Sequence, residues 1–269
     1  MKELLYYAEL AYKFLHEKET SYLAGKKSIS LLFNKGFMLK DYSNPNTRLI
    51  INARLTLIDS YYSTNVGKMR YFGISDIVES IMEISKSDED LVLLTKEFQN
   101  NSDISKLEKL LEGNYGYSKN LENKGKATSL LSKYLYFLSD YNFPIYDSIV
   151  KKYYKPIVKF FKVELNDASG LGNIKFFHEM EILNKHVNDF NKLDNLIWLF
   201  GKIKKGSYSL IVSKEVYEKL ISRMKGIHGE DVKDHDIQKY VGEKLKELEE
   251  WKVFNQFQIK FIRFVYNVK

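Results

Sequence analysis

Apolar residues recur at intervals of three and four along most of the chain. In the segment 2–17 this spacing predicts an amphipathic helix. The same periodicity predicts helices over 49–60, 74–86, 106–112, 126–138, 148–161, 178–190 and 193–200. Only three prolines and fourteen glycines interrupt the 269 residues, so long regular segments are expected. The pattern therefore predicts a mostly α fold.

Individual residues predict where these helices begin and end. Ser75 and Asp147 stand at the start of helical segments and are expected to cap their N-termini. Gly113 and Gly201 follow helical segments and are expected to end them, because glycine favours the position after a helix C-terminus. The sequence Asn-Pro-Asn at 44–46 predicts a turn.

Three stretches have a less regular pattern. Residues 20–45 are broken by Gly25 and Gly36 and are compatible with loops that include either a hairpin or a brief helix. Residues 207–213 (SYSLIVS) are a possible strand. The region 214–269 predicts two or three helices, and opposite charges spaced three apart near 243–252 indicate a solvated helix there.

Composition and charge narrow the possible partners. Apolar residues make up 44% of the chain, which is enough for a sizeable core. Lys and Arg number 42 against 35 Asp and Glu, so the net charge is +7 and a polyanionic partner is favoured. The stretch from Lys119 to Lys159 contains eight lysines and three acidic residues, so most of the excess positive charge lies there.

Several classes of site and location are excluded or disfavoured. The chain has no cysteine, which excludes disulfides, thiolate zinc sites, iron–sulfur clusters and a cysteine nucleophile. No apolar run approaches the roughly 20 residues that span a bilayer, and the N-terminus is unlike a signal peptide. We therefore expect a cytoplasmic protein without a membrane partner.

The histidines do not indicate a metal site. His178 and His186 are eight residues apart, which is not the i, i+4 spacing of a zinc-binding helix. The polar run 228–236 could hold a metal, but a solvated loop is the simpler interpretation. The chain also lacks a glycine-rich phosphate loop with Lys-Ser/Thr. We therefore predict no metal and no cofactor.

Three ordered segments carry a family resemblance. Residues 52–65 form a helical pattern that ends in the polar run Tyr62-Ser63-Thr64-Asn65. Residues 125–150 join Gly125 to an apolar helix and then to Phe-Pro-Ile-Tyr-Asp147-Ser. Residues 193–202 read LDNLIWLFGK. Together they resemble the helix-hairpin-helix DNA glycosylase superfamily, namely its early helix beside the base pocket, the helix and catalytic-aspartate segment after the hairpin, and a later core helix.

The resemblance implies a two-lobed helical fold and a role in base excision. It assigns a glycosylase-like core to 49–203, with an N-terminal segment 1–48 packed on it and a helical extension 204–269. It implies a DNA-binding N-glycosylase that removes a damaged, mismatched or modified base, with Asp147 as the catalytic carboxylate. Such a carboxylate stabilises the positive charge that develops on the sugar. Asp147 also suits a simple N-cap role, and the two roles are compatible.

The chain departs from the superfamily pattern at the hairpin. A sequence close to Leu-Pro-Gly-apolar-Gly is expected there, whereas residues 121–125 read LENKG. Gly125 keeps the position of the second glycine, but the proline and first glycine are missing. Bifunctional members carry a lysine two residues after that glycine, where this chain has Ala127. A Schiff-base lysine is therefore not supported, and a monofunctional mechanism is expected.

A glycosylase must flip its target base out of the duplex and hold it in a pocket. The residues expected to line this base pocket are Tyr62, Ser63, Thr64, Asn65, Tyr146 and Trp198, and Tyr61, Tyr71 and Phe72 are further aromatic candidates. Each assignment has a structural alternative. An aromatic residue can belong to the core, and the three polar residues can cap and turn the chain.

The basic stretch is expected to contact the nucleic-acid backbone. The candidate contacts are Lys119, Lys124, Gly125, Lys126, Lys133, Lys151 and Lys152. At about 100° per residue, Lys126, Ser129 and Lys133 share the polar side of the predicted helix 126–138. The alternative is a solvated lysine face without a ligand. For the whole protein, the alternative to an enzyme is a catalytically inactive glycosylase-like scaffold that binds nucleic acid or a protein partner.

Overall fold

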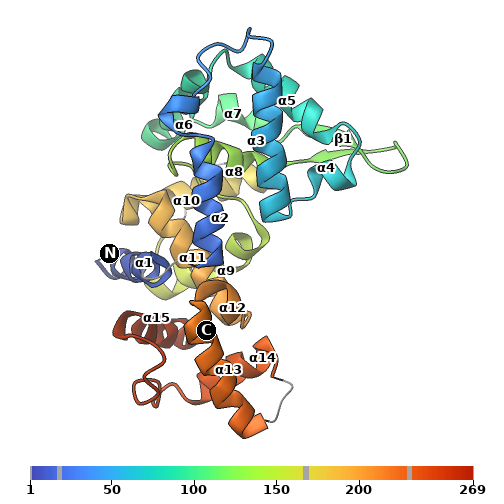
Figure 1. Cartoon of the computed structure of the whole chain (residues 1–269). Helices are drawn as coiled ribbons and strands as arrows, with labels where there is room; N and C mark the ends of the chain where they lie inside the picture. Colours follow the sequence, from blue (N-terminus) through green and yellow to red (C-terminus); the bar gives the residue numbers. More distant parts are fainter. Residues whose placement is uncertain (1, 17–19, 166–169, 229–231, 269) are drawn as a thin grey trace. The chain divides into compact units, whose positions relative to one another are not determined.

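The structure is a computed structural model, and it confirms that the chain is mostly helical (Figure 1). It describes residues 2–16, 20–165, 170–228 and 232–268. The chain forms two compact units, of which unit 1 contains residues 1–26, 148–164 and 183–269 and unit 2 contains residues 27–147 and 165–182. None of the described helices is both long enough and apolar enough to cross a membrane.

Unit 2 is built around one buried helix, α8. Its elements are η1 (Lys35–Phe37), α3 (Thr47–Tyr62), α4 (Val66–Met69), α5 (Gly73–Ile84), α6 (Asp88–Asn101), α7 (Ser105–Leu111), β1 (Asn114–Tyr117), β2 (Lys124–Lys126) and α8 (Thr128–Leu138). Helix α8 has apolar side chains on nearly every side, and all of its residues except Ser129 are buried. A helix that is apolar all round belongs inside a core, and α3, α6 and α7 pack against α8.

A two-stranded antiparallel hairpin connects α7 to α8. In its register Asn114 pairs with Lys126 and Tyr115 with Gly125, and a bulge follows before Tyr117 pairs with Lys124. Strand β1 packs on α5. The contact is possible because Gly116 has a φ of +61° and a Cβ there would lie 2.5 Å from the Cα of Gly73. The hairpin is therefore held closely against the start of α5.

Unit 1 is built around α11. Its elements are α1 (Lys2–His16), α9 (Ser148–Phe161), α11 (Phe190–Lys204), α12 (Tyr208–Ile211), α13 (Lys214–His228), α14 (Asp234–Glu243) and α15 (Gln256–Asn267). Helices α1, α9, α12 and α15 contact α11. Aromatic rings fill much of this core, and Tyr7 of α1 stacks on Phe264 of α15 with ring centroids 4.0 Å apart. Two further helices, α2 (Ser21–Leu31) and α10 (Gly172–Val187), contribute residues to both units.

Two residues predicted to mark helix boundaries do not do so, and the predicted helices 178–190 and 193–200 correspond to α10 and α11 with different bounds. Gly201 does not end its helix, because α11 continues to Lys204. The residue serves packing instead, since a Cβ at Gly201 would overlap Ile149 and lie 2.7 Å from Tyr153, both on α9. Ser75 is not an N-cap. It lies inside α5, which begins after Phe72 in the left-handed conformation. At Gly201 the local signal is outweighed by packing against a distant part of the chain.

Three less regular stretches are now resolved. Residues 20–45 form the helix α2 and the short helix η1, so the alternative with a brief helix is the one observed. The possible strand at 207–213 is wrong, because α12 buries Tyr208 and Ile211 three residues apart on one helical turn. The predicted charged helix near 243–252 is also wrong. Helix α14 ends at Glu243, and the turns after it bring Trp251 back to stack on Tyr240 at 4.9 Å.

Candidate nucleic-acid interface

Asp147 lies directly before the first residue of α9, as predicted, and its side chain is half-buried. The preceding residues are fixed within unit 2. Phe143, Pro144 and Ile145 are buried. The backbone N–H of Tyr146 donates to Ser132 Oγ at 2.9 Å. The carboxylate therefore follows a rigid segment, which is what positioning a charge for chemistry requires.

Tyr146 is held in place through its hydroxyl and its ring. Its hydroxyl donates to Asn173 of α10, and its ring meets Phe176 edge-on at 5.1 Å. Asn173 Nδ2 in turn donates to Thr128 Oγ1 at 3.2 Å, and Thr128 donates to the Leu111 carbonyl at 2.8 Å. These contacts join the segment before Asp147 to the first turn of α8. Tyr146 therefore has a structural role in unit 2.

The polar run Ser63-Thr64-Asn65 forms a turn between α3 and α4. Ser63 and Asn65 both have positive φ, and Asn65 Nδ2 donates to the Ser63 carbonyl at 2.8 Å. Asp59, which sequence inspection did not single out, organises this turn. Its carboxylate accepts hydrogen bonds from the Thr64 hydroxyl, from Val66 N at 2.8 Å and from Gly67 N at 2.9 Å. In this structure Thr64 therefore helps to cap and turn the chain, which was the alternative to lining a base pocket.

Two of the predicted aromatic pocket residues are packed against their neighbours. Trp198 is buried in unit 1, where Tyr22 stacks on it at 3.9 Å and the Lys202 ammonium lies 5.2 Å from the ring centre. Tyr62, in unit 2, is half-buried beneath the Lys133 ammonium, which lies 5.3 Å from its ring centre. Trp198 belongs to unit 1, whereas Tyr62 and Tyr146 belong to unit 2. A base stacked on Trp198 would have to displace Tyr22.

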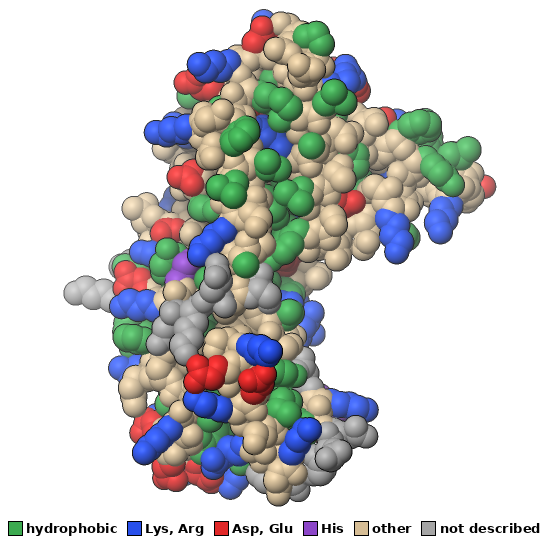
Figure 2. All heavy atoms as spheres, viewed as in Figure 1, with side chains coloured by type: hydrophobic (Ala, Val, Ile, Leu, Met, Phe, Trp, Pro, Cys, Tyr) green, Lys and Arg blue, Asp and Glu red, His purple; other side chains and the backbone are tan. Residues whose placement is uncertain are grey.

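The predicted phosphate-binding lysines fall into two groups. Lys119, Lys124, Lys126, Lys151 and Lys152 are exposed. Lys133 is only 2% exposed, so its predicted place on a polar face is wrong. Its ammonium donates to Ser129 Oγ at 2.8 Å and packs on Tyr62, because α8 is enclosed on all sides. Figure 2 shows lysine and arginine side chains close to apolar ones over the hairpin of unit 2.

The hairpin lysines have specific neighbours. Lys124 lies 3.2 Å from Asp76 of α5, and Lys126 pairs with Glu112. Gly125 has a packing role, because a Cβ there would overlap the guanidinium of Arg70, which also donates to the Tyr115 carbonyl at 3.3 Å. Sequence reasoning missed Arg70 and Asp76. Both come from the segment before β1, about 40 to 55 residues away from the hairpin residues they contact.

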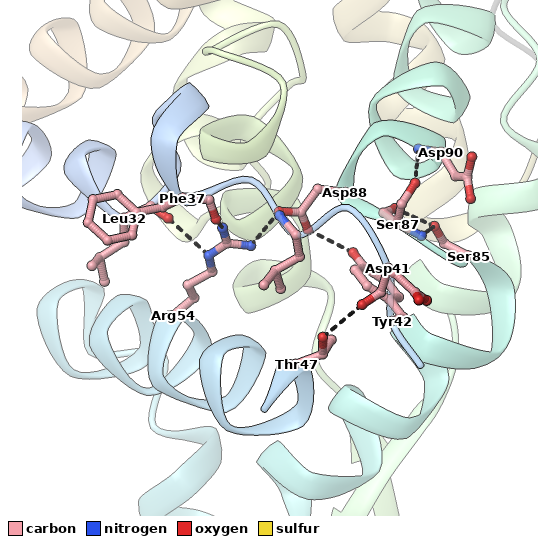
Figure 3. A network of polar contacts seen from close by, with 11 residues as sticks. Leu32, Phe37, Asp41, Tyr42, Thr47, Arg54, Ser85, Ser87, Asp88 and Asp90 are labelled. Atoms are coloured by element: carbon pink, nitrogen blue, oxygen red, sulfur yellow. Dashed lines mark hydrogen bonds and ion pairs between the residues drawn. The ribbon is translucent and has the colours of Figure 1, made fainter. Parts of the chain in front are cut away.

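A buried ion pair forms the other main polar cluster of unit 2 (Figure 3). Arg54 of α3 donates to Asp88 at 2.8 Å, to the Leu32 carbonyl at 3.0 Å and to the Phe37 carbonyl at 2.6 Å. Asp88 also accepts from Tyr42 Oη at 2.8 Å and Leu39 N at 2.7 Å. Burial, with smaller contributions from Tyr134 and Asp88, raises the pKa of Tyr42. This cluster fastens the segment before α3 to α3 and α6.

Unit 1 contains a buried lysine that composition alone does not reveal. Lys26 donates to Asn191 Oδ1 at 2.7 Å and lies 5.9 Å from the ring centre of Tyr22. Burial lowers the pKa of Lys26 to about 8, against the opposing effect of Asp194 and Asp189. No group of three or more metal-ligating side chains occurs among the described residues. Residues 229–231 of the polar run considered as a metal alternative lie outside them.

Comparison of the chain with protein-family models, with curated protein sequences and with solved structures finds no significant match.

Proposed function

We propose that this protein is a DNA-binding N-glycosylase that hydrolyses the bond between a damaged, mismatched or modified base and its sugar. The observation that carries the proposal is the placement of Asp147. The half-buried carboxylate stands before the first turn of α9 and shortly after the buried residues 143–145, at the position that the family resemblance assigns to the catalytic aspartate. The exposed lysines on both sides of it in the sequence supply charge for a polyanionic ligand.

The proposed reaction needs only a carboxylate and water. As the C1′–N bond breaks, the sugar becomes positively charged, and the carboxylate of Asp147 stabilises that charge. The oxygen of a water molecule then bonds to C1′, one of its protons is released to the departing base or to solvent, and an abasic site remains. No lysine takes part, because Ala127 stands at the Schiff-base position and Lys133 packs on Tyr62.

The test is a single-turnover excision assay. Duplexes that carry oxidised, deaminated, alkylated, methylated and mispaired bases are incubated with the full chain, and abasic sites are detected by alkaline cleavage. The proposal predicts cleavage of at least one duplex. Asp147→Asn should reduce the rate by about 10²-fold or more, a loss typical of removing one electrostatic stabiliser. The proposal fails if none of the duplexes yields abasic sites.

A matched control separates catalysis from folding. Asn is as good an N-cap as Asp, so Asp147→Asn should leave α9 and the melting temperature unchanged. Asp140→Asn removes the same charge from an exposed residue of unit 2, at a left-handed position that Asn tolerates, and should retain full activity. Equal rates for the two variants would remove Asp147 from the mechanism.

The second candidate is a nucleic-acid-binding scaffold of the same fold without catalysis. The turn at 63–65 favours this candidate, because its polar side chains are used within the protein. The Thr64 hydroxyl donates to Asp59, and the Asn65 side-chain amide donates to the Ser63 carbonyl. A scaffold would bind duplex or single-stranded DNA with a strong salt dependence and release no base. Binding of DNA without abasic sites from any duplex supports the scaffold, and absence of both contradicts both candidates.

A further inference from the structure

The hairpin of unit 2 carries a cluster of exposed aromatic and basic side chains, which we name the hairpin platform. Its apolar members are Met69, Tyr71, Phe72, Tyr117 and Leu121, and its cations are Lys68, Lys119, Lys124 and Lys126. These residues come from the end of α4, the segment before α5, the two strands and the loop between them. Figure 2 shows apolar and basic side chains side by side over this part of unit 2.

Strand pairing aligns three of the platform side chains. Tyr71 and Tyr117 exchange two backbone hydrogen bonds, of 3.0 and 2.9 Å, and Tyr117 pairs with Lys124 in the hairpin register. Directly opposed residues of antiparallel strands place their side chains on the same face. The Lys124 ammonium accordingly lies 4.9 Å from the centre of the Tyr117 ring. Two rings and a cation therefore form a row across the sheet.

Phe72 adds a strained and exposed ring beside this row. Its φ is +62°, although it has a bulky side chain, and the side chain is 68% exposed. Bulky residues rarely adopt the left-handed conformation, and a large exposed ring gains little from burial. Such strain is characteristic of sites where function, rather than stability, selects the residue. The neighbouring Tyr71 is 54% exposed.

The charge of the platform indicates an anionic ligand. Lys124 and Lys126 are partly offset by Asp76 and Glu112, whereas Lys68 and Lys119 have no ion-pair partner among the described residues. At Lys124 and Tyr117 a cation and an aromatic ring lie in direct contact. Nucleic acids with accessible bases offer a partner for each, since bases stack on aromatic rings and phosphates bind cations.

We propose that the hairpin platform binds single-stranded nucleic acid by stacking unpaired bases on Tyr71 and Phe72 while the lysines contact the phosphates. A paired duplex buries its base faces and offers only the phosphates. The platform therefore binds a single strand more tightly than a blunt duplex of equal length. This binding does not depend on Asp147 being catalytic, because the platform and Asp147 are different groups with different readouts.

The test measures binding of fluorescently labelled oligothymidine by anisotropy, with a blunt duplex, heparin and anionic lipid vesicles as comparison ligands. Phe72→Gly is the central variant, because glycine accepts the positive φ and the protein should melt at the same or a higher temperature. Its affinity for the single strand should nevertheless fall about fivefold or more, as expected when one aromatic ring that stacks on a base is lost. Tyr71→Ala should weaken binding to a similar degree.

Two controls define the outcome. Leu49→Ala removes an exposed apolar side chain of α3 outside the platform and should leave the affinity unchanged. Lys119→Gln should lower the slope of log affinity against log salt concentration by about 0.7, the value for one phosphate contact on a single strand. Unchanged affinity in Phe72→Gly overturns the proposal, as does equal binding of heparin or a preference for vesicles. The two proposals can fail separately. Absence of base excision by the wild type would refute the proposed enzyme, and single-strand binding by Asp147→Asn would still support the hairpin platform.

Discussion

Two of the clusters in unit 2 where a cation meets aromatic rings differ in burial. In the first, Arg54 is 1% exposed, lies 4.7 Å from the centre of the Phe33 ring and donates to Asp88 and two backbone carbonyls. In the second, the hairpin platform, Lys124 lies 4.9 Å from the Tyr117 ring, and both side chains remain exposed. The same kind of contact therefore occurs in a closed and an open setting.

The difference shows what each cluster is suited to do. A buried guanidinium needs its carboxylate and carbonyl partners, because an unpaired charge in the interior is strongly unfavourable. Each nitrogen of the buried Arg54 guanidinium donates to one of these partners within the protein. The cluster therefore contributes to the stability of the fold. Exposed cations keep their water and can exchange it for phosphate. We expect mutations in the first cluster to change stability and mutations in the second to change binding.

The largest expected effect comes from Asp88→Asn. The substitution leaves Arg54 charged and buried without its carboxylate, and loss of one partner of such a pair costs about 3–5 kcal/mol. Urea unfolding followed by circular dichroism measures the change. Glu89→Gln is the matched control, because it removes the same charge from an exposed residue in the first turn of α6. Similar losses in the two variants would mean that the buried pair contributes little.

A smaller loss is expected from Gly116→Ala, which tests the attachment of the hairpin. The residue has a positive φ and a Cβ there would press on Gly73, so we expect a loss of about 1–3 kcal/mol. Single-strand affinity should fall as well, because displacement of β1 from α5 disturbs the row of Tyr71 and Tyr117. Gly226→Ala in α13 meets nothing within 4 Å and should stabilise the protein by up to about 1 kcal/mol. Loss of affinity without loss of stability would contradict the close packing.

The smallest effect at neutral pH, with a distinctive pH dependence, is expected from Tyr115→Phe. Tyr115 Oη donates to the Leu110 carbonyl at 2.6 Å, so its removal should cost about 1 kcal/mol. Burial raises the pKa of Tyr115 to about 12, whereas an unfolded tyrosine titrates near 10. Between these pH values the unfolded chain loses the phenolic proton first, so this group's contribution to stability falls as the pH rises.

Unfolding free energies of wild type and Tyr115→Phe, measured from pH 8 to 11.5, test this linkage. The difference between the two proteins should narrow above about pH 10, because the Phe variant lacks the titrating group. Tyr117→Phe changes an exposed tyrosine of the same strand and should alter stability at neutral pH by no more than about 0.5 kcal/mol. A constant difference between wild type and Tyr115→Phe across the range would contradict the burial of this phenol.

Local periodicity predicted most helices because helix formation depends on residues three and four apart. The helices at 2–17, 49–60 and 148–161 are confirmed as α1, α3 and α9, with no end differing by more than two residues. The hairpin was missed because its strands are only four and three residues long and contain glycine. Gly201 was misinterpreted because its small size serves the packing of α11 on α9, a contact made 50 residues away in sequence.

The candidate site could be predicted only in part for the same reason. The position of Asp147 before α9 follows from adjacent residues, and the structure has it there. The roles of Asp59 and Arg70 depend on turns and strands that bring distant residues together, so no sequence spacing pointed to them. The catalytic and DNA-binding assignments stay predictions, with the assays above as their tests.

The sequence by itself determined the helical segments, the absence of cysteine chemistry and the concentration of lysines between residues 119 and 159. Only the tertiary structure decided which of these cations reach solvent. Lys133 is enclosed because α8 is covered on every side, whereas Lys119 and Lys124 lie on a hairpin and remain exposed. Charge and helical phase are properties of the local chain, but burial depends on which distant elements pack around a residue.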